Sequence, residues 1–224
     1  MPPISILFLG NNTGYSNQVK TALEAAGYPL VSNQKQADLI ISAAYGQKLP
    51  PGGLNLHPSF LPAYRGATPV PYQILNNETK SGISIIKMTD QFDAGPIVAQ
   101  EPVPILPDDT SLDLLKRCFT AGAKLLVKIL PDYLNNKITL KPQPNQSPTP
   151  YCRRFTKQDG FITWEEFKKG ADERKIRALY PWPGVWTKIP NNKILKLLPK
   201  NLLQLEGKQP ITRKQFEAGY GHLL

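Results

Sequence analysis

Two polar side chains placed two residues apart, Asn55 and His57, have the types needed for acyl-group chemistry. They follow a short apolar segment, and in an extended chain residues i and i+2 point to the same side. An amide beside an imidazole can stabilise a developing oxyanion and help to move a proton. Ligand sites in open α/β sheets lie at the carboxyl ends of strands, where this pair falls. The competing interpretation is structural, because a histidine that precedes a proline is often a buried residue with local hydrogen bonds.

Asp93 is a third candidate, in the segment 90–97 (DQFDAGPI) between two expected strands. An aspartate in a glycine-containing turn is commonly explained by turn chemistry alone. The residue type therefore leaves both a catalytic and a structural interpretation open for Asp93.

Other common site chemistries find little support. The segment Gly10–Gly14 matches neither the dinucleotide fingerprint nor a P-loop, so a nucleotide enzyme is not supported. His57 and His222 are the only histidines, and no metal site is expected. Cys118 and Cys152 show no CxxC spacing, which predicts free thiols in a reducing cytoplasm. No apolar run approaches the roughly 20 residues of a membrane-spanning helix, so we expect neither a membrane segment nor a signal peptide.

Hydrophobic patterning predicts an α/β sheet around these residues. Short apolar runs are typical of buried strands, and apolar residues at helical spacing predict helices. Strands alternating with helices favour parallel neighbours. The expected strands are 4–9, 37–44, 54–56, 82–88 and 97–105, and the expected helices cover 19–26, 68–77 and 110–130.

A proline-rich linker and a small β-rich module follow. Residues 141–150 (KPQPNQSPTP) contain four prolines and should be extended. Beyond them, Phe161–Trp164 is expected as a strand and Glu165–Leu179 as a helix. Further strands are expected at 185–189, 193–198 and 202–205.

Positive charge is concentrated in the last third of the chain. Residues 151–224 contain 15 Lys and Arg against 7 Asp and Glu, a net of +8, whereas residues 1–150 contain 12 and 10, a net of +2. Such a basic segment suggests a polyanionic partner, although a solubilising surface explains it equally well. We divide the chain into a catalytic domain at 1–140, a linker at 141–150 and a basic domain at 151–224.

Several segments, in this order, resemble the folate-dependent formyltransferases. They are the loop Ala43–Pro50, the motif N-x-H-P-S-x-L-P at 55–62, Y-R-G at 64–66 and D-x-x-D-x-G-P-I at 90–97. That family includes methionyl-tRNA, glycinamide ribonucleotide and sugar-nucleotide enzymes. The resemblance covers most of the chain from about residue 37 onward. The segments closest to the tRNA branch are 65–69, 160–164 and 177–184.

The resemblance implies a reduced Rossmann-like parallel-sheet formyltransferase domain followed by a small OB-like β domain. It implies that Asn55, His57 and Asp93 are catalytic, with Asp93 close to His57. The co-substrate would be 10-formyltetrahydrofolate, without a metal, and the attacking group a neutral amine. The implied folate contacts are Tyr45, Gly46, Gln47, Lys48, Leu49, Ser59, Phe60, Leu61, Pro62, Asp90 and Phe92.

The leading functional interpretation is a cytoplasmic, monomeric enzyme that formylates charged initiator methionyl-tRNA for translation initiation. A sugar-nucleotide N-formyltransferase is the alternative, and a binding protein that has lost catalysis is a third. Trp182 and Trp186 are interpreted as core residues of the small domain. The expected tRNA contacts are Arg65, Arg153, Arg154, Lys193 and Lys196.

Two departures from the family pattern concern tRNA selectivity more than catalysis. Only Tyr28–Gln36 separates the first helix from the next strand, too short for a βαβ crossover of roughly 30 residues. The missing stretch would include a basic loop that tRNA enzymes place against the acceptor stem. The C-terminal part offers about four strand candidates, whereas a full OB fold has five.

Overall fold

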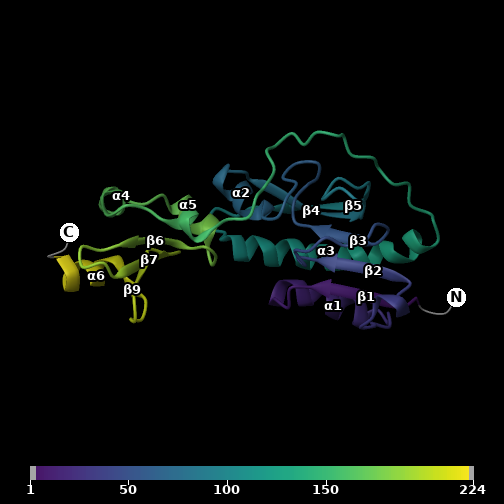
Figure 1. The fold of residues 1–224 in the computed structure, drawn as a ribbon, viewed down its shortest axis with the longest axis horizontal. Coiled ribbons are helices and arrows are strands. Elements are labelled where there is room, and N and C mark those ends of the chain that lie inside the picture. Colours follow the sequence, from purple (N-terminus) through teal and green to yellow (C-terminus); the bar gives the residue numbers. More distant parts are fainter. Residues whose placement is uncertain (1–3, 222–224) are drawn as a thin grey trace.

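The structure is a computed structural model and describes residues 4–221. Its first part is a five-stranded sheet in the order β1-β2-β3-β4-β5, with three helices (Figure 1). The strands are β1 Ile6–Gly10, β2 Leu39–Ala43, β3 Leu54–His57, β4 Lys80–Lys87 and β5 Ile97–Pro104, and the helices are α1 Gly14–Ala25, α2 Pro69–Leu75 and α3 Ser111–Leu134, with a 3-10 turn at Gln34–Gln36.

The sheet is mixed, whereas the resemblance implied a parallel one. β1, β2 and β3 run parallel, and β4 and β5 are antiparallel to their neighbours. A parallel neighbour requires a crossover that traverses the sheet, usually along a helix. The connection from β3 to β4 contains only the 7-residue helix α2, and these two strands are antiparallel. β2 and β3 are an exception to the usual helical crossover, because they are parallel although the loop that joins them, residues 44–53, contains no helix.

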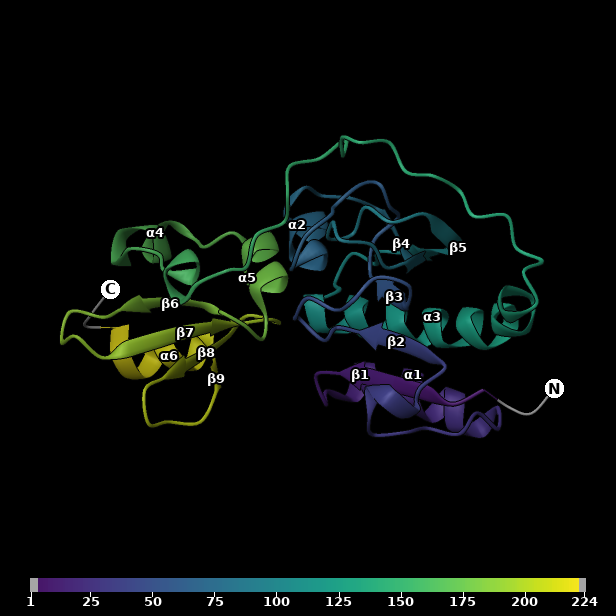
Figure 2. The same cartoon turned by 45° about the vertical axis from the view of Figure 1, so that its right-hand side comes forward.

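The core of this part forms where α1 and α3 pack together against the sheet (Figure 2). α3 begins at Ser111 because Thr110 and Asp113 form a reciprocal capping box. Its apolar stripe includes the buried Phe119, whose ring stacks on Tyr15 of α1. The amphipathic patterns expected for both helices therefore place them side by side.

β1 lies at one edge of the sheet. Along that edge, residues 29–31 pair only with Ile6, whose N–H donates to Pro29 and whose carbonyl accepts from Val31. The short 28–36 segment thus covers the start of β1 but adds no strand. The sheet is correspondingly narrower than the resemblance would give.

The second part is a four-stranded antiparallel sheet in the order β6-β7-β8-β9 with its own apolar core. Its elements are a 3-10 turn at Lys157–Gly160, α4 Trp164–Lys169, α5 Glu173–Leu179, β6 Val185–Lys188, β7 Ile194–Leu198, β8 Leu202–Leu205, β9 Ile211–Thr212 and α6 Arg213–Tyr220.

Two expectations for this part were wrong. Phe161–Trp164 is not a strand: only Phe161 pairs, with Trp186, and α4 already begins at Trp164 because Thr163 and Glu166 form a capping box. Residues 165–179 are two helices rather than one. Gly170, with φ of 99°, ends α4, and Asp172 caps the start of α5. β9 and α6 were not expected.

The two parts meet along α5, which packs against α2 and α3. Ala178 of α5 belongs to the core of the first part, and its carbonyl accepts a 2.5 Å hydrogen bond from Ser111 Oγ. Arg177 donates to the Asp109 carbonyl at 2.9 Å. These contacts fix the start of α3 against the C-terminal part. Among the helices of residues 4–221, none is long and apolar enough to cross a membrane.

Candidate functional site

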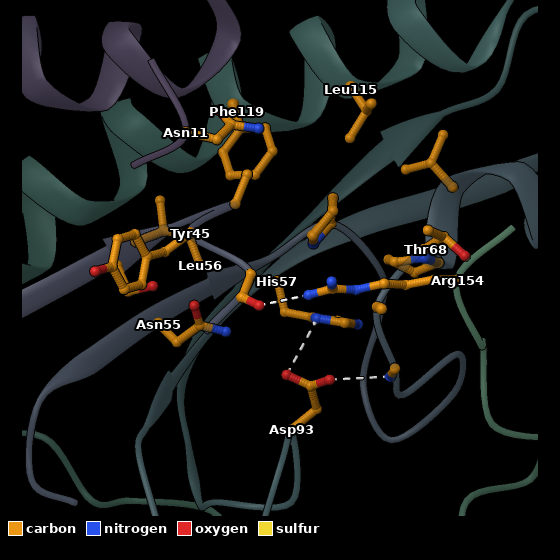
Figure 3. A pocket seen from close by; sticks show the side chains of 18 of the residues that line it. Asn11, Tyr45, Asn55, Leu56, His57, Thr68, Asp93, Leu115, Phe119 and Arg154 are labelled. Atoms are coloured by element: carbon orange, nitrogen blue, oxygen red, sulfur yellow. Dashed lines mark hydrogen bonds and ion pairs between the residues drawn. The ribbon is translucent and has the colours of Figure 1, made fainter. Parts of the chain in front are cut away.

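A cavity of about 950 Å³ opens at the carboxyl ends of β1, β2 and β3 and reaches the C-terminal part. It is lined by segments that follow these three strands, by the turn 88–93 and by the start of α3. Residues 66–71 and 180–182, together with Tyr151, Arg154 and Phe155, also line it. Asn55, His57 and Asp93 all line it, so the three candidates from separate segments share one site (Figure 3).

His57 and Asp93 form a pair at the wall of this cavity, in which His57 is buried and the Asp93 side chain is 12% exposed. His57 Nδ1 lies 3.4 Å from Asp93 Oδ1, and His57 Nε2 lies 2.9 Å from the carbonyl oxygen of Tyr64. Because a carbonyl only accepts, Nε2 carries a proton, and Nδ1 is the nitrogen that titrates. The 3.4 Å contact is long for a hydrogen bond. The Nδ1 proton can therefore be shared with a group that enters the cavity.

The Asp93 carboxylate is held from a second side. Its Oδ2 accepts a 2.9 Å hydrogen bond from the backbone N–H of Gly66 (Figure 3). Asp93 has φ of 54°, and Tyr64, which binds His57, has φ of 61°. Left-handed backbone at non-glycine residues is costly and is often found at functional sites. Both partners of His57 thus lie on sharply turned backbone.

The electrostatics favour a charged pair. Burial disfavours imidazolium, but the Asp93 carboxylate and the Tyr64 carbonyl outweigh it, so the pKa of His57 lies above its ordinary value. Burial opposes ionisation of Asp93 too, yet His57, the Gly66 N–H and Arg65 hold the pKa of Asp93 below its ordinary value. Near neutrality we expect imidazolium beside carboxylate.

Asn55 lies at the end of β3 beside this pair, on the same side of the strand as His57 (Figure 3). Within residues 4–221, no group hydrogen-bonds its side-chain amide. A half-buried amide without a protein partner at a cavity wall is available to a ligand. The Asn55 N–H groups and the Nδ1–H of His57 together offer donors at one place.

The expected folate contacts divide into two groups. The loop 45–49 and the turn residues Asp90 and Phe92 line the cavity. Ser59–Pro62 does not. After Pro58 the chain turns toward β4, where Leu61 N–H donates to Ser84 Oγ and the Leu61 side chain packs on Ile97. Phe60 covers Gly82 and is 47% exposed. This segment therefore supports the wall from behind.

Several lining residues were not anticipated as site residues. The α3 residues Ser111, Leu112, Leu115, Lys116 and Phe119 line the cavity, as do Tyr151, Phe155 and Trp182. Trp182 is 65% exposed, so the core interpretation was wrong for it. Trp186 is half-buried, and its indole N–H donates to the Lys157 carbonyl. The available signal for Trp182 was its place between two prolines, which keeps it out of a strand or helix.

The residues expected to contact tRNA differ in whether their side chains are exposed. Arg65 is buried, and four hydrogen bonds join its guanidinium to Gln143, Pro144 and Asn145. This contradicts a contact between Arg65 and a phosphate. Arg153 is exposed but is paired with Asp159 at 2.6 Å. Arg154 lines the cavity and donates to the Gly46 carbonyl, and Lys193 and Lys196 are exposed at β7.

Gly66 is the position of this site where only glycine fits. Its φ is 125°, and a Cβ there would lie 2.5 Å from the Cys152 carbonyl oxygen. We expect Gly66→Ala to lower the free energy of unfolding by at least roughly 1–3 kcal/mol. Gly219→Ala in α6, where a Cβ meets nothing within 4 Å, is the control and should not lower it, because alanine is favoured over glycine inside a helix. Chemical denaturation of both variants measures this, and equal values would contradict the strain argument.

No group of three or more His, Cys, Asp or Glu side chains in the described part of the chain could hold a metal ion. Both described cysteines are buried free thiols, and burial, with Asp93 nearby, raises the pKa of Cys152 to about 12. The chemistry that these residues can offer is donation to an oxygen, by an amide and an imidazolium held by a carboxylate.

Comparisons with known proteins agree with this geometry. The family model described as "Formyl transferase" matches residues 15–130, and the one described as "Formyl transferase, C-terminal domain" matches residues 154–219. A methionyl-tRNA formyltransferase of Dehalococcoides mccartyi is 33% identical over 228 residues, which cover 96% of this chain and 70% of that protein. One of Listeria monocytogenes is 37% identical over 161 residues, covering 68% of this chain but 51% of that protein. The chain therefore spans about half the length of several relatives that it matches.

Solved structures share the fold at lower identity. The N-formyltransferase of Helicobacter canadensis, in complex with folinic acid and dTDP-3-aminofucose, superposes with a TM-score of 0.68 at 20% identity, covering 90% of this chain and 88% of that one. Two family models, which together match β2–β5 and the C-terminal sheet, agree with a relative that is matched along nearly the whole chain. The chain belongs to the formyl transferase family.

Proposed function

We propose that this protein transfers a formyl group from 10-formyltetrahydrofolate to an amine. The observation that carries the proposal is the Asn55 amide, which has no side-chain hydrogen bond within residues 4–221, beside the His57–Asp93 pair at the wall of a large cavity. Negative charge develops on the formyl oxygen as the amine attacks, and each donor aimed at that oxygen is worth a few kcal/mol in the transition state. The folate supplies the activated formyl group.

The geometry narrows the part that His57 can take. Nε2 is already bound to the Tyr64 carbonyl, so only the Nδ1–H can reach the formyl oxygen. Asp93 keeps the ring charged and faces the same nitrogen. The carboxylate can then accept the amine's proton, directly or through water, while His57 remains a donor. The same proton can pass to the folate nitrogen when its bond to the formyl carbon breaks, which releases tetrahydrofolate.

We propose that the acceptor is the amino group of methionyl-tRNA. We expect the tRNA to be the initiator tRNA, because the proposed product serves translation initiation. The named relatives are methionyl-tRNA formyltransferases, and the last third of the chain has a net charge of +8. Arg154 lies at the cavity, and Lys196 lies on β7 with Lys193 immediately before that strand. Trp182 offers an exposed aromatic surface at the cavity wall. Cations with an exposed aromatic suit a single-stranded nucleic acid end.

A sugar nucleotide is the alternative acceptor. It is favoured by the likeness of fold to the Helicobacter canadensis protein, whose complex contains dTDP-3-aminofucose. The hydrogen-bond donors of Asn55 and His57 would serve either amine equally well. The two acceptors differ instead in how many phosphates the protein must bind.

Salt dependence separates the two acceptors. If cations of the C-terminal part contact tRNA phosphates, the logarithm of the binding constant falls by close to one power of salt per contact. Lys193→Gln with Lys196→Gln should reduce that slope by about two. A salt titration of tRNA binding measures this. A sugar nucleotide brings only two phosphates and should give a shallow slope.

The matched control is Lys20→Gln with Lys35→Gln, which removes two exposed lysines from the first part of the chain. Its slope should equal that of the unaltered protein. A flat slope for the unaltered protein, together with formyl transfer to an amino-sugar nucleotide, would replace the tRNA proposal by the alternative.

A further inference from the structure

The proline-rich segment is bound along the first sheet domain rather than free. We call residues 141–152 the strap, and it runs as an extended chain from the end of α3 past β5 toward the C-terminal part (Figure 1, Figure 2). Its prolines at 142, 144, 148 and 150 are exposed, whereas Gln143, Ser147 and Thr149 are half-buried. A period of two is that of an extended chain. Since proline has no N–H, polar side chains make the contacts that a strand would make through its backbone.

Gln143 fastens the turn that contains Asp93. Its amide nitrogen donates to the Asp93 carbonyl at 3.0 Å and to the Gly95 carbonyl at 2.6 Å. Its amide oxygen accepts from Arg65, at 2.9 Å from Nη2 and 3.2 Å from Nε. Because a guanidinium only donates, Arg65 fixes which end of the amide faces Asp93. Arg65 therefore acts on Asp93 through Gln143.

The strap also fastens the other partners of the pair. Thr149 Oγ1 accepts a 2.6 Å hydrogen bond from the N–H of Tyr64, whose carbonyl binds His57. Cys152 pairs with Gly66, whose N–H holds the Asp93 carboxylate. Both segments that hold His57 and Asp93 in place are therefore hydrogen-bonded to one stretch of chain.

We propose that Gln143 is a positioning residue, which holds the Asp93 turn at the distance from His57 that formyl transfer requires. This rests on the proposed function. Gln143 binds the backbone carbonyl of Asp93, a residue in left-handed conformation, and makes no hydrogen bond to the Asp93 carboxylate or the His57 ring within residues 4–221. Misplacement of a reacting group by about 1 Å can cost about 10²-fold in rate.

The test is Gln143→Met, which keeps the length of the side chain and removes both of its polar functions. In a His222→Gln background His57 is the only histidine, and its titration is followed by NMR without any substrate. We expect the pKa of His57 to fall toward its ordinary value, since Asp93 is its main charged partner, with Arg65 and Arg154 nearby. We expect kcat for formyl transfer to fall by about 10- to 100-fold with KM little changed.

Gln146→Met is the matched control, because it makes the same kind of substitution at an exposed residue of the strap that has no side-chain hydrogen bond within residues 4–221. It should leave both the pKa of His57 and kcat unchanged. If Gln143→Met does not fold, Gln143→Glu retains an acceptor for Arg65 but loses the donors to the turn, and kcat should still fall.

The proposal would be overturned if Gln143→Met kept the His57 titration and the kcat of the unaltered protein, or if Gln146→Met shifted both equally. Should no acceptor be formylated by the unaltered protein, the proposed function fails, while the NMR titration still decides whether Gln143 positions Asp93.

Discussion

Asn55→Ala is expected to lower kcat for formyl transfer by about 10²-fold or more, and His57→Ala by at least as much. Each removes a donor aimed at the oxygen on which charge develops, and one such donor is worth about 10²–10³ in kcat. KM for the folate should change far less, because the interaction is stronger in the transition state than in the ground state. Steady-state kinetics with 10-formyltetrahydrofolate and charged tRNA measure both.

Asn11→Ala is the control for Asn55. Asn11 lines the same cavity, but its side chain is already bonded to Thr13 and Tyr15. Its effect on kcat should be at least tenfold smaller. A variant of Asn55 or His57 with near-normal kcat and a lowered free energy of unfolding would favour the structural interpretation of that residue.

Asp93→Asn should reduce kcat by about 10²-fold and also move the pH dependence. With Asp93 ionised, the pKa of His57 lies above 6.5, so the active imidazolium persists to higher pH. Replacing the carboxylate leaves burial as the main influence on His57, and its pKa should fall below that of the unaltered protein. The high-pH limb of kcat against pH should then shift to lower pH.

The free energy of unfolding should also depend on pH through His57 and Asp93. The raised pKa of His57 gives a contribution that is fully present below pH 6.5 and is lost as pH rises through the folded pKa. The lowered pKa of Asp93 gives one that is present above pH 3.8 and is lost as pH falls through the folded pKa. The difference in unfolding free energy between the unaltered protein and Asp93→Asn should be largest between these limits. An unshifted pH–rate profile in Asp93→Asn would contradict the pairing.

Short-range pattern was enough to predict much of the sheet domain. The apolar runs at β1 and β2 and the periodic stripe of α3 were read from neighbouring residues, because burial on one face imposes a period on the local sequence. The same reasoning placed Asn55 and His57 on one side of β3. It fared less well around 161–179, where the caps at Thr163 and Asp172 and the break at Gly170 override the hydrophobic pattern.

Other features depended on contacts between residues far apart in the chain. Asp93 meets His57 and Gly66, Arg65 is enclosed by residues 143–145, and Trp182 reaches the wall of a cavity built by strands more than a hundred residues earlier. The turn after Pro58 points Leu61 at Ile97, not at the cavity. The sequence by itself therefore determined which side chains could do the chemistry and which strand carries two of them. Only the tertiary structure decided that the strap holds the turn of Asp93, the third of these residues. Hydrogen bonds between residues so far apart impose no periodic pattern on the sequence between them, so the sequence could not predict them.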